Sequence, residues 1–175
     1  LGVEVPFMRQ SNLADDYVGT TEVIAHAVLW MMNQGWSLDA VCCIYATAAL
    51  VQSEDLNRGW KALDSGNWSY ALSVTKYDSS IFRSFKIHSG GGLEMFFPEK
   101  WEMRSQDLPI ALYDAAQFYW GRPEAWANSL KIFDHYSYPV QIPSWRVQDV
   151  DTLEDWRSAE LKFRILEQEK KILSE

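Results

Sequence analysis

At 175 residues the chain is long enough for one domain with a sizeable hydrophobic core. Its net charge of −8 argues against nucleic acid as a partner, because phosphate backbones are bound by clustered Lys and Arg. No stretch reaches the roughly 18 apolar residues of a membrane-spanning helix, so no membrane partner is expected either. We therefore expect a single domain over residues 1–175.

Helical and extended patterns alternate along the first half of the chain. Residues 20–34 carry apolar side chains at helical spacing and predict a helix. Residues 40–48 form a continuous apolar run, which is typical of a parallel strand covered on both faces. Residues 54–64 return to helical spacing, and residues 69–76 predict a second apolar strand. The alternation indicates an α/β sheet with helices on its faces.

The two cysteines, Cys42 and Cys43, are neighbours within the first apolar run. Adjacent residues of a strand point to opposite faces, so a disulfide between them would be strained. We expect two reduced, buried thiols in a cytoplasmic protein.

A different pattern occupies residues 83–101. Residues 85–88 and 93–97 predict short strands, joined by a glycine-rich turn at residues 89–92. A hairpin that leaves the main sheet is expected there.

The end of the chain predicts short strands followed by a long helix. Pro123 suits the first turn of a short helix. Residues 140–142 and 146–150 predict strands. Thr152 and Asp155 have the spacing of a capping box, which predicts that a long amphipathic helix begins there.

Asp149 and Asp151 give the strongest local signal for chemistry. Alternation places both carboxylates on one face, at the end of a predicted strand and just before the last helix. Ligands of open α/β sheets bind beyond the carboxyl ends of strands, and Mg²⁺ often takes one or two carboxylates together with substrate phosphates. A magnesium site is one interpretation. The other is that Asp151 helps to cap the helix while Asp149 is solvated.

A second candidate cluster lies on the predicted strand at residues 115–120. Alternation places Gln117 and Tyr119 on the same face as Ala115. An amide and a phenol on an otherwise apolar strand suit a polyhydroxylated ligand, and Arg104 can pair bidentately with a carboxylate. Buried polar groups with partners inside the fold explain the same residues equally well.

Taken together, six segments resemble the acylneuraminate-type cytidylyltransferases, most closely their pseudaminic acid branch. The segments are residues 4–9 (EVPFMR), 13–20 (LADDYVGT), 41–47 (VCCIYAT), 104–109 (RSQDLP), 114–121 (DAAQFYWG) and 146–152 (RVQDVDT). The resemblance covers essentially the whole chain, and the last two strings together are specific.

The resemblance implies transfer of CMP from CTP to the anomeric hydroxyl of a nine-carbon 2-keto sugar acid, pseudaminic acid, with release of pyrophosphate. Such a product would serve surface or flagellar glycosylation. The implied fold is a doubly wound, mostly parallel, Rossmann-type α/β sheet of the nucleotide-diphospho-sugar transferase kind. The hairpin at residues 83–101 is implied to pair two copies into a homodimer.

The resemblance also assigns roles to residues. Asp149 and Asp151 are implied to be catalytic and to hold Mg²⁺ against the triphosphate, and Arg9 to lie near the cytosine. The substrate-binding residues are implied to be Arg104, Gln106, Gln117 and Tyr119, which line the sugar-acid pocket, and Tyr45 and Thr47, which lie at the loop between the two ligands.

This chain departs from the usual pattern of the family at several points. The family normally begins with a Gly-, Arg- and Lys-rich loop that clamps the triphosphate, and this chain is expected to be N-terminally truncated and to lack it. Tyr113 stands where a histidine is common, and Ala49 and Leu50 replace a proline–aromatic pair. The alternatives are therefore a CMP-sialic or CMP-legionaminic acid synthetase, or a non-catalytic fragment that keeps a sugar-acid pocket or a dimer surface.

Overall fold

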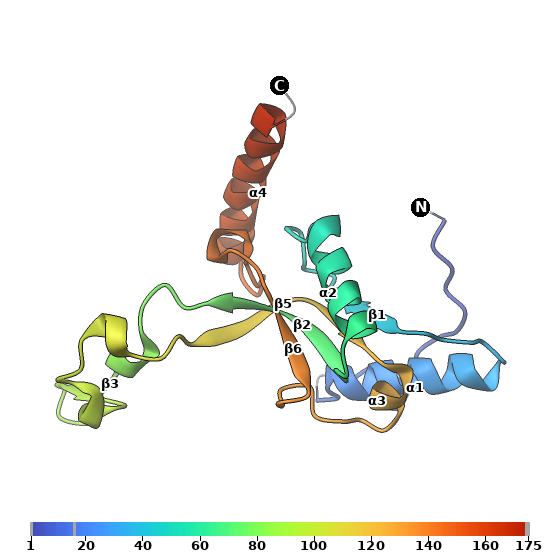
Figure 1. The fold of residues 1–175 in the computed structure, drawn as a ribbon, viewed down its shortest axis with the longest axis horizontal. Coiled ribbons are helices and arrows are strands. Elements are labelled where there is room, and N and C mark those ends of the chain that lie inside the picture. Colours follow the sequence, from blue (N-terminus) through green and yellow to red (C-terminus); the bar gives the residue numbers. More distant parts are fainter. Residues whose placement is uncertain (1, 16, 174–175) are drawn as a thin grey trace.

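A mixed four-stranded sheet forms the centre of the computed structural model, which describes residues 2–15 and 17–173 (Figure 1). Its strands, in the spatial order β1-β5-β2-β6, are β1 (Val41–Ile44), β5 (Leu112–Gly121), β2 (Tyr70–Lys76) and β6 (Ser137–Gln141). β5 is antiparallel to both β1 and β2, and β6 is parallel to β2. β1, β2 and β6 therefore run in one direction and β5 in the other.

Helices cover both faces of this sheet (Figure 1). They are α1 (Thr20–Asn33), α2 (Ser53–Ser65), α3 (Pro123–Ala127) and α4 (Leu153–Leu173). Short 3₁₀ turns lie at Ser11–Leu13, Ile81–Arg83, Pro98–Lys100, Ser105–Asp107 and Ser144–Arg146. α1 and α3 pack on one face and α2 on the other, whereas α4 rises away from the sheet. The prediction of an α/β fold is confirmed at this level.

The alternation of β2 divides the core between the two faces. Tyr70 and Leu72 pack with the helices α1 and α3, while Ala71 between them packs with α2. Burial on both faces explains why the strand is mostly apolar, and Ser73 and Thr75 are its buried polar residues. The sequence prediction for residues 69–76 is therefore confirmed.

α2 lies unusually close to β5 because Gly59 faces it. A Cβ atom at Gly59 would lie 2.6 Å from Trp120 Cδ1 and 3.0 Å from Phe118 Cε2. The missing side chain lets the helix backbone rest on these two aromatic rings. Trp120 in turn donates a hydrogen bond from Nε1 to the carbonyl of Leu56, at 3.0 Å.

A bulge interrupts β5 and changes which face of the sheet some of its side chains occupy. Ala116 has a φ of 48°, and the register with β2 shifts at this point. The extra residues in β5 reverse the facing of its side chains, so Ala115 packs with α2 and Tyr119 packs on the opposite face. The prediction that Ala115 shares a face with Tyr119 is therefore wrong.

Within residues 2–15 and 17–173, β1 occupies an edge of the sheet and pairs only with the antiparallel strand β5. Three of its residues are half-buried and Ile44 is exposed. The prediction of a parallel strand buried on both faces is wrong for residues 41–44, because a neighbour lies on one side only of β1 within the described chain. Cys42 and Cys43 are free thiols, as expected, but they are half-buried rather than fully buried.

A narrow arm extends from the body of the molecule and carries the strands β3 (Phe85–Ile87) and β4 (Leu93–Met95) (Figure 1). The two strands pair antiparallel, which confirms the predicted hairpin. Lys86 and Glu94 form an ion pair of 3.0 Å across it. Several large apolar side chains of the arm are exposed, among them Ile87 at 80% and Leu93 at 74%.

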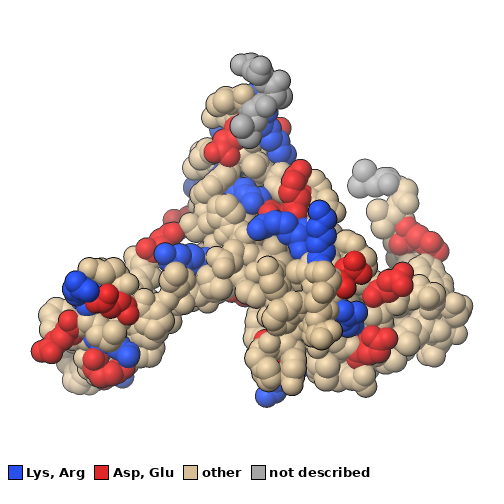
Figure 2. Space-filling model, viewed as in Figure 1, with Lys and Arg blue, Asp and Glu red and all other residues tan. Residues whose placement is uncertain are grey.

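Acidic and basic side chains are interspersed on the face shown in Figure 2, over the arm, α4 and α2. Within residues 2–15 and 17–173, no helix is long and apolar enough to cross a membrane. Ahead of α1, Asp15 Oδ1 accepts hydrogen bonds from the backbone amides of Tyr17 and Val18, both at 2.9 Å.

Candidate functional site

Asp149 and Asp151 lie in an irregular segment between the sheet and α4. The last sheet hydrogen bond on this side joins Ile142 N to Val74 O at 2.8 Å, after which Pro143 and a 3₁₀ turn direct the chain away. Residues 147–150 have no strand neighbour, so the prediction of a strand over residues 146–150 is wrong.

Both carboxylates of this acidic segment, residues 149–151, are exposed. Asp149 Oδ1 accepts a hydrogen bond from the adjacent amide of Val150 at 3.1 Å. In the described part of the chain, the carboxylate of Asp151 has no hydrogen bond or ion pair. No cluster of three or more His, Cys, Asp or Glu side chains capable of holding a metal occurs among residues 2–15 and 17–173. The acidic segment therefore offers two exposed carboxylates, of which only Asp149 Oδ1 accepts a hydrogen bond within the described residues, and a metal ion there would need further ligands from elsewhere.

The capping box predicted at the start of α4 is confirmed. Thr152 Oγ1 accepts a hydrogen bond from the amide of Asp155 at 3.2 Å, and Asp155 Oδ2 accepts one from the amide of Thr152 at 2.9 Å. The Thr152 hydroxyl also donates to Asp155 Oδ2 at 2.6 Å, which lowers the pKa of Asp155. Asp155, rather than Asp151, thus provides the carboxylate of the cap, and Asp151 contributes only its amide to Asp155, at 3.3 Å.

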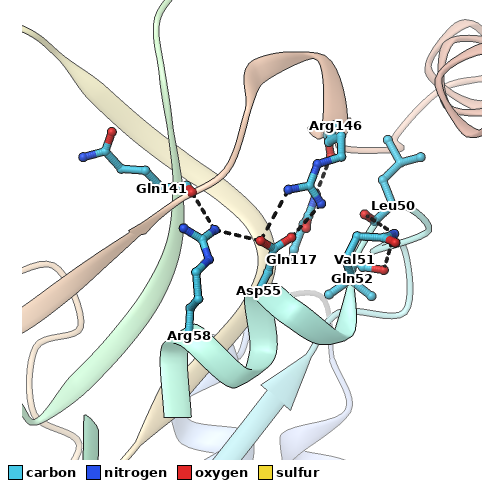
Figure 3. A network of polar contacts seen from close by, with 8 residues as sticks. All are labelled: Leu50, Val51, Gln52, Asp55, Arg58, Gln117, Gln141 and Arg146. Atoms are coloured by element: carbon cyan, nitrogen blue, oxygen red, sulfur yellow. Dashed lines mark hydrogen bonds and ion pairs between the residues drawn. The ribbon is translucent and has the colours of Figure 1, made fainter. Parts of the chain in front are cut away.

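A buried ion pair anchors the start of the acidic segment (Figure 3). Arg146 Nη1 lies 2.6 Å from Asp55 Oδ2, and Arg146 Nη2 lies 3.3 Å from Asp55 Oδ1. Arg58 Nη2 approaches Asp55 Oδ1 at 2.7 Å from the solvent side and also donates to Gln141 O at 2.8 Å. The side chains of Asp55 and Arg146 are only 4% and 12% exposed. The pair therefore joins α2 to the segment that leads to Asp149.

Gln117 reaches the same anchor from β5 (Figure 3). Its side chain is buried, and its Nε2 donates to the carbonyl of Arg146 at 2.6 Å. Within the described chain, Gln117 Oε1 is buried without a hydrogen-bond partner. The backbone amides of Gln117 and Phe118, displaced by the bulge, both donate to Ser73 Oγ at 3.1 Å.

Tyr119 and Tyr45 form an aromatic pair on the face of the sheet that packs against α1 and α3. Their ring centroids lie 5.3 Å apart in an edge-on arrangement. The Tyr119 hydroxyl donates to Asp114 Oδ2, and the Tyr45 hydroxyl lies 3.2 Å from Thr20 Oγ1. Burial, followed by the hydrogen bond to Asp114, raises the pKa of Tyr119. Both hydroxyls thus have partners inside the fold.

Arg104, Gln106 and Arg9 are exposed. Arg104 Nε donates to Asp107 Oδ2 at 2.8 Å, and the two side chains are 71% and 46% exposed. Gln106 lines a polar cleft of about 350 Å³ at the base of the arm, together with Lys76 and Tyr77. Arg9 is exposed, and its side chain forms no hydrogen bond or ion pair within the described residues.

Thr47 lines a different, mostly apolar cleft of about 570 Å³. The cleft lies between the loop after β1 and the helix α4, and Val150 of the acidic segment, Trp156 and Phe163 also line it. The structure thus brings Thr47 close to the acidic segment. It brings Gln106 to a separate cleft, so the six predicted substrate-binding residues do not line one cavity in this chain.

Three curated relatives match this chain. Pseudaminic acid cytidylyltransferase of Campylobacter jejuni serotype O:2 is 32% identical over 164 residues, which are 94% of this chain and 71% of the relative. The enzyme of the same name from C. jejuni serotype O:23/36 is 31% identical over the same shares. A Helicobacter pylori protein named pseudaminic acid cytidylyltransferase and UDP-2,4-diacetamido-2,4,6-trideoxy-beta-L-altropyranose hydrolase is 28% identical over 91% of this chain and 30% of its own length.

The chain belongs to the pseudaminic acid cytidylyltransferase family. The resemblance recognised in the sequence is therefore confirmed. No protein-family profile matches the chain.

Two residues that hold the acidic segment through hydrogen bonds, Asp55 and Lys162, were not predicted from the sequence. Asp55 carried a usable signal, because it shares a buried stripe with Gly59 and Leu63 at intervals of four residues on α2. A carboxylate on the apolar face of a helix requires a buried partner. Lys162 offered no comparable signal, since it stands among several charged residues of α4.

Proposed function

We propose that the protein transfers CMP from CTP to the anomeric hydroxyl of pseudaminic acid and releases pyrophosphate, supplying an activated sugar for surface or flagellar glycans. The observation that carries this proposal is the match with two pseudaminic acid cytidylyltransferases over 94% of the chain. In this reaction the sugar oxygen forms a bond to the α-phosphorus of CTP. The bond from that phosphorus to the oxygen shared with the β-phosphate breaks.

Asp149 and Asp151 are the proposed ligands of a Mg²⁺ ion that is bound together with CTP. Both carboxylates are exposed, and Mg²⁺ prefers such hard oxygen donors while keeping sites for water and substrate phosphates. Since no cluster of three or more His, Cys, Asp or Glu side chains occurs within the described residues, the site is proposed to be completed by the triphosphate and water. The bound cation would offset the negative charge that develops on the phosphates during transfer.

The sugar acid is proposed to contact the exposed residues Arg104 and Gln106 and the loop that carries Tyr45 and Thr47, although Gln106 and Thr47 line separate clefts in this chain. Arg104 can exchange its exposed partner Asp107 for the carboxylate of the substrate at small cost, because exposed ion pairs are weak. Arg9 is proposed to lie near the cytosine.

Gln117 and Tyr119 stand further inside the fold, with their hydrogen bonds to Arg146 and Asp114. Direct contact of either residue with the sugar acid requires movement, and an unpaired Oε1 makes Gln117 the better acceptor for a sugar hydroxyl.

The proposed assembly is a homodimer of a doubly wound, Rossmann-type domain over residues 1–175, joined through the arm at residues 83–101. Ile87, Leu93 and Trp101 of the arm are 80%, 74% and 61% exposed. Apolar side chains exposed at this level favour burial against a partner surface. Light scattering of the protein and of Ile87→Asp tests this: a dimer that dissociates in the variant supports the arm as its interface.

Product analysis tests the proposed activity. The protein is incubated with CTP, Mg²⁺ and pseudaminic acid, and the phosphorus NMR spectrum is recorded. We expect a phosphodiester signal of a CMP-sugar together with pyrophosphate. Parallel reactions contain legionaminic or N-acetylneuraminic acid. A faster reaction with either of these acids would contradict the proposed substrate.

A further inference from the structure

Lys162 of α4 makes an unusual set of contacts for a lysine in an acidic protein. Its Nζ donates to the backbone carbonyl of Val147 at 2.7 Å and to Gln148 Oε1 at 2.9 Å. Within the described chain it forms no ion pair with a carboxylate, and it is half-buried. Burying part of a charged ammonium group costs free energy, and here the group binds two neutral acceptors instead of a carboxylate. This indicates that the positions of these two acceptors, Val147 O and Gln148 Oε1, are important.

Gln148 extends this contact directly to the acidic segment. Its Nε2 donates to the carbonyl of Asp149 at 2.9 Å and to Asp155 Oδ1 at 3.2 Å. One end of the amide is therefore held by Lys162, and the other end holds the backbone of Asp149. Reversal of this amide would place its NH₂ group against the ammonium of Lys162, so the ammonium also fixes the orientation of the amide.

Residues 146–149 need such support because no neighbouring strand provides backbone hydrogen bonds there. From the side of the sheet, Asp55 and Gln117 hold the side chain and carbonyl of Arg146. From the side of α4, Lys162 and Gln148 hold the next residues. The backbone is thus anchored from both sides, whereas the carboxylates of Asp149 and Asp151 stay exposed.

We propose that Lys162 is a positioning residue, which acts through Gln148 to fix the backbone of Asp149 so that both carboxylates can meet one nucleotide-bound cation. The inference rests on the proposed metal site at Asp149 and Asp151. Lys162 itself touches neither substrate nor metal in this account. Outer partners that orient ligands commonly change metal affinity by about 10- to 100-fold.

The test compares Lys162→Met with Lys162→Arg and with the matched control Lys170→Met. Lys170 lies further along the same helix and, among the described residues, forms only an exposed ion pair with Glu167, at 3.2 Å. Binding of Mn²⁺ is measured by electron paramagnetic resonance in the presence of saturating CTP, beside the thermal transition of each variant. Hydrogen exchange at residues 146–152 reports whether the segment has loosened.

We expect Lys162→Met to weaken Mn²⁺ binding in the CTP complex about tenfold. We also expect faster exchange at residues 146–152. Lys162→Arg should restore most of the affinity, because a guanidinium can donate to the same two acceptors. Lys170→Met should match the wild-type protein in both measurements. Gln148→Met serves as a second variant should Lys162→Met fold poorly, and it should weaken Mn²⁺ binding in the same direction.

Equal Mn²⁺ affinity in Lys162→Met, Gln148→Met and Lys170→Met would overturn the positioning role. Asp151→Asn separates this failure from a failure of the metal site. Loss of Mn²⁺ binding in Asp151→Asn with normal binding in Lys162→Met removes only the positioning role. Normal Mn²⁺ binding in Asp151→Asn would overturn the metal site and the positioning role together.

Discussion

Replacing Asp55 by Asn removes the negative charge that balances Arg146 inside the protein. The two side chains are only 4% and 12% exposed, and their shortest contact is 2.6 Å. Removing one partner of a buried ion pair leaves the other charge uncompensated, which typically costs about 3–5 kcal/mol. We expect Asp55→Asn to lower the free energy of unfolding by an amount in this range.

Arg58→Met is the matched control for this substitution. Arg58 contacts the same carboxylate at 2.7 Å, but its side chain is 51% exposed. Exposed ion pairs contribute about 0–1 kcal/mol, so this variant should lose far less stability than Asp55→Asn.

Urea-induced unfolding, followed by circular dichroism, measures both free energies, and equal slopes against urea would show that the unfolded states are comparable. In a double-mutant cycle, Asp55→Asn should cost much less when Arg146→Met is already present. A loss below about 1 kcal/mol for Asp55→Asn would refute the claim that this pair anchors the acidic segment.

Three further substitutions or modifications test other parts of the structure. Gly59→Ala should destabilise the protein by about 1–2 kcal/mol in urea, because overpacking against Trp120 outweighs the better helix propensity of alanine; a gain in stability would show that the ring yields easily. The hydrogen bond from Thr152 lowers the pKa of Asp155, so this carboxylate stabilises the fold above its ordinary pKa and the contribution disappears as the pH falls through the lowered value. Asp155→Asn should therefore melt below the wild-type temperature at pH 7, and the two melting curves should converge in acid; a constant difference would contradict the assignment. Burial raises the pKa of Cys42 to about 12, so its thiol should react slowly with Ellman's reagent at pH 8 until urea unfolds the protein, and equal rates in both states would argue against its burial.

Features that depend on neighbouring residues in the sequence were predicted well. The helices α1 and α2, the strand β2 and the hairpin of β3 and β4 agree with the patterns of apolar residues and glycines. The predicted capping box of Thr152 and Asp155 is present, with both of its reciprocal hydrogen bonds. Each of these features is stabilised largely by contacts within a short stretch of chain.

Features that depend on distant partners were predicted poorly. The apolar run of β1 resembles a central strand, but apolar content does not reveal which strands flank it. The bulge at Ala116 arises because Asp114 and Ser73 bind the displaced amides. Ser73 lies on another strand, so strict alternation predicted the wrong face for Ala115.

The acidic segment combines both cases. The position of Asp149 and Asp151 just before α4 was predicted from the capping box, which is local. Their supports come from three other elements, through Asp55, Gln117 and Lys162. A continuous strand was predicted for residues 146–150 because the sequence alternates there, whereas these side-chain contacts hold an irregular backbone.

Release of pyrophosphate by the wild-type protein, by Asp151→Asn and by Glu154→Gln tests the central claim most directly. Glu154 is an exposed carboxylate in the first turn of α4, so its substitution removes the same charge from the same region. With CTP, Mg²⁺ and pseudaminic acid, the account predicts that Asp151→Asn loses nearly all turnover while its melting temperature stays close to that of the wild type. Glu154→Gln should keep its turnover. Retained turnover in Asp151→Asn, or an equal loss in both variants, would contradict catalysis at Asp149 and Asp151.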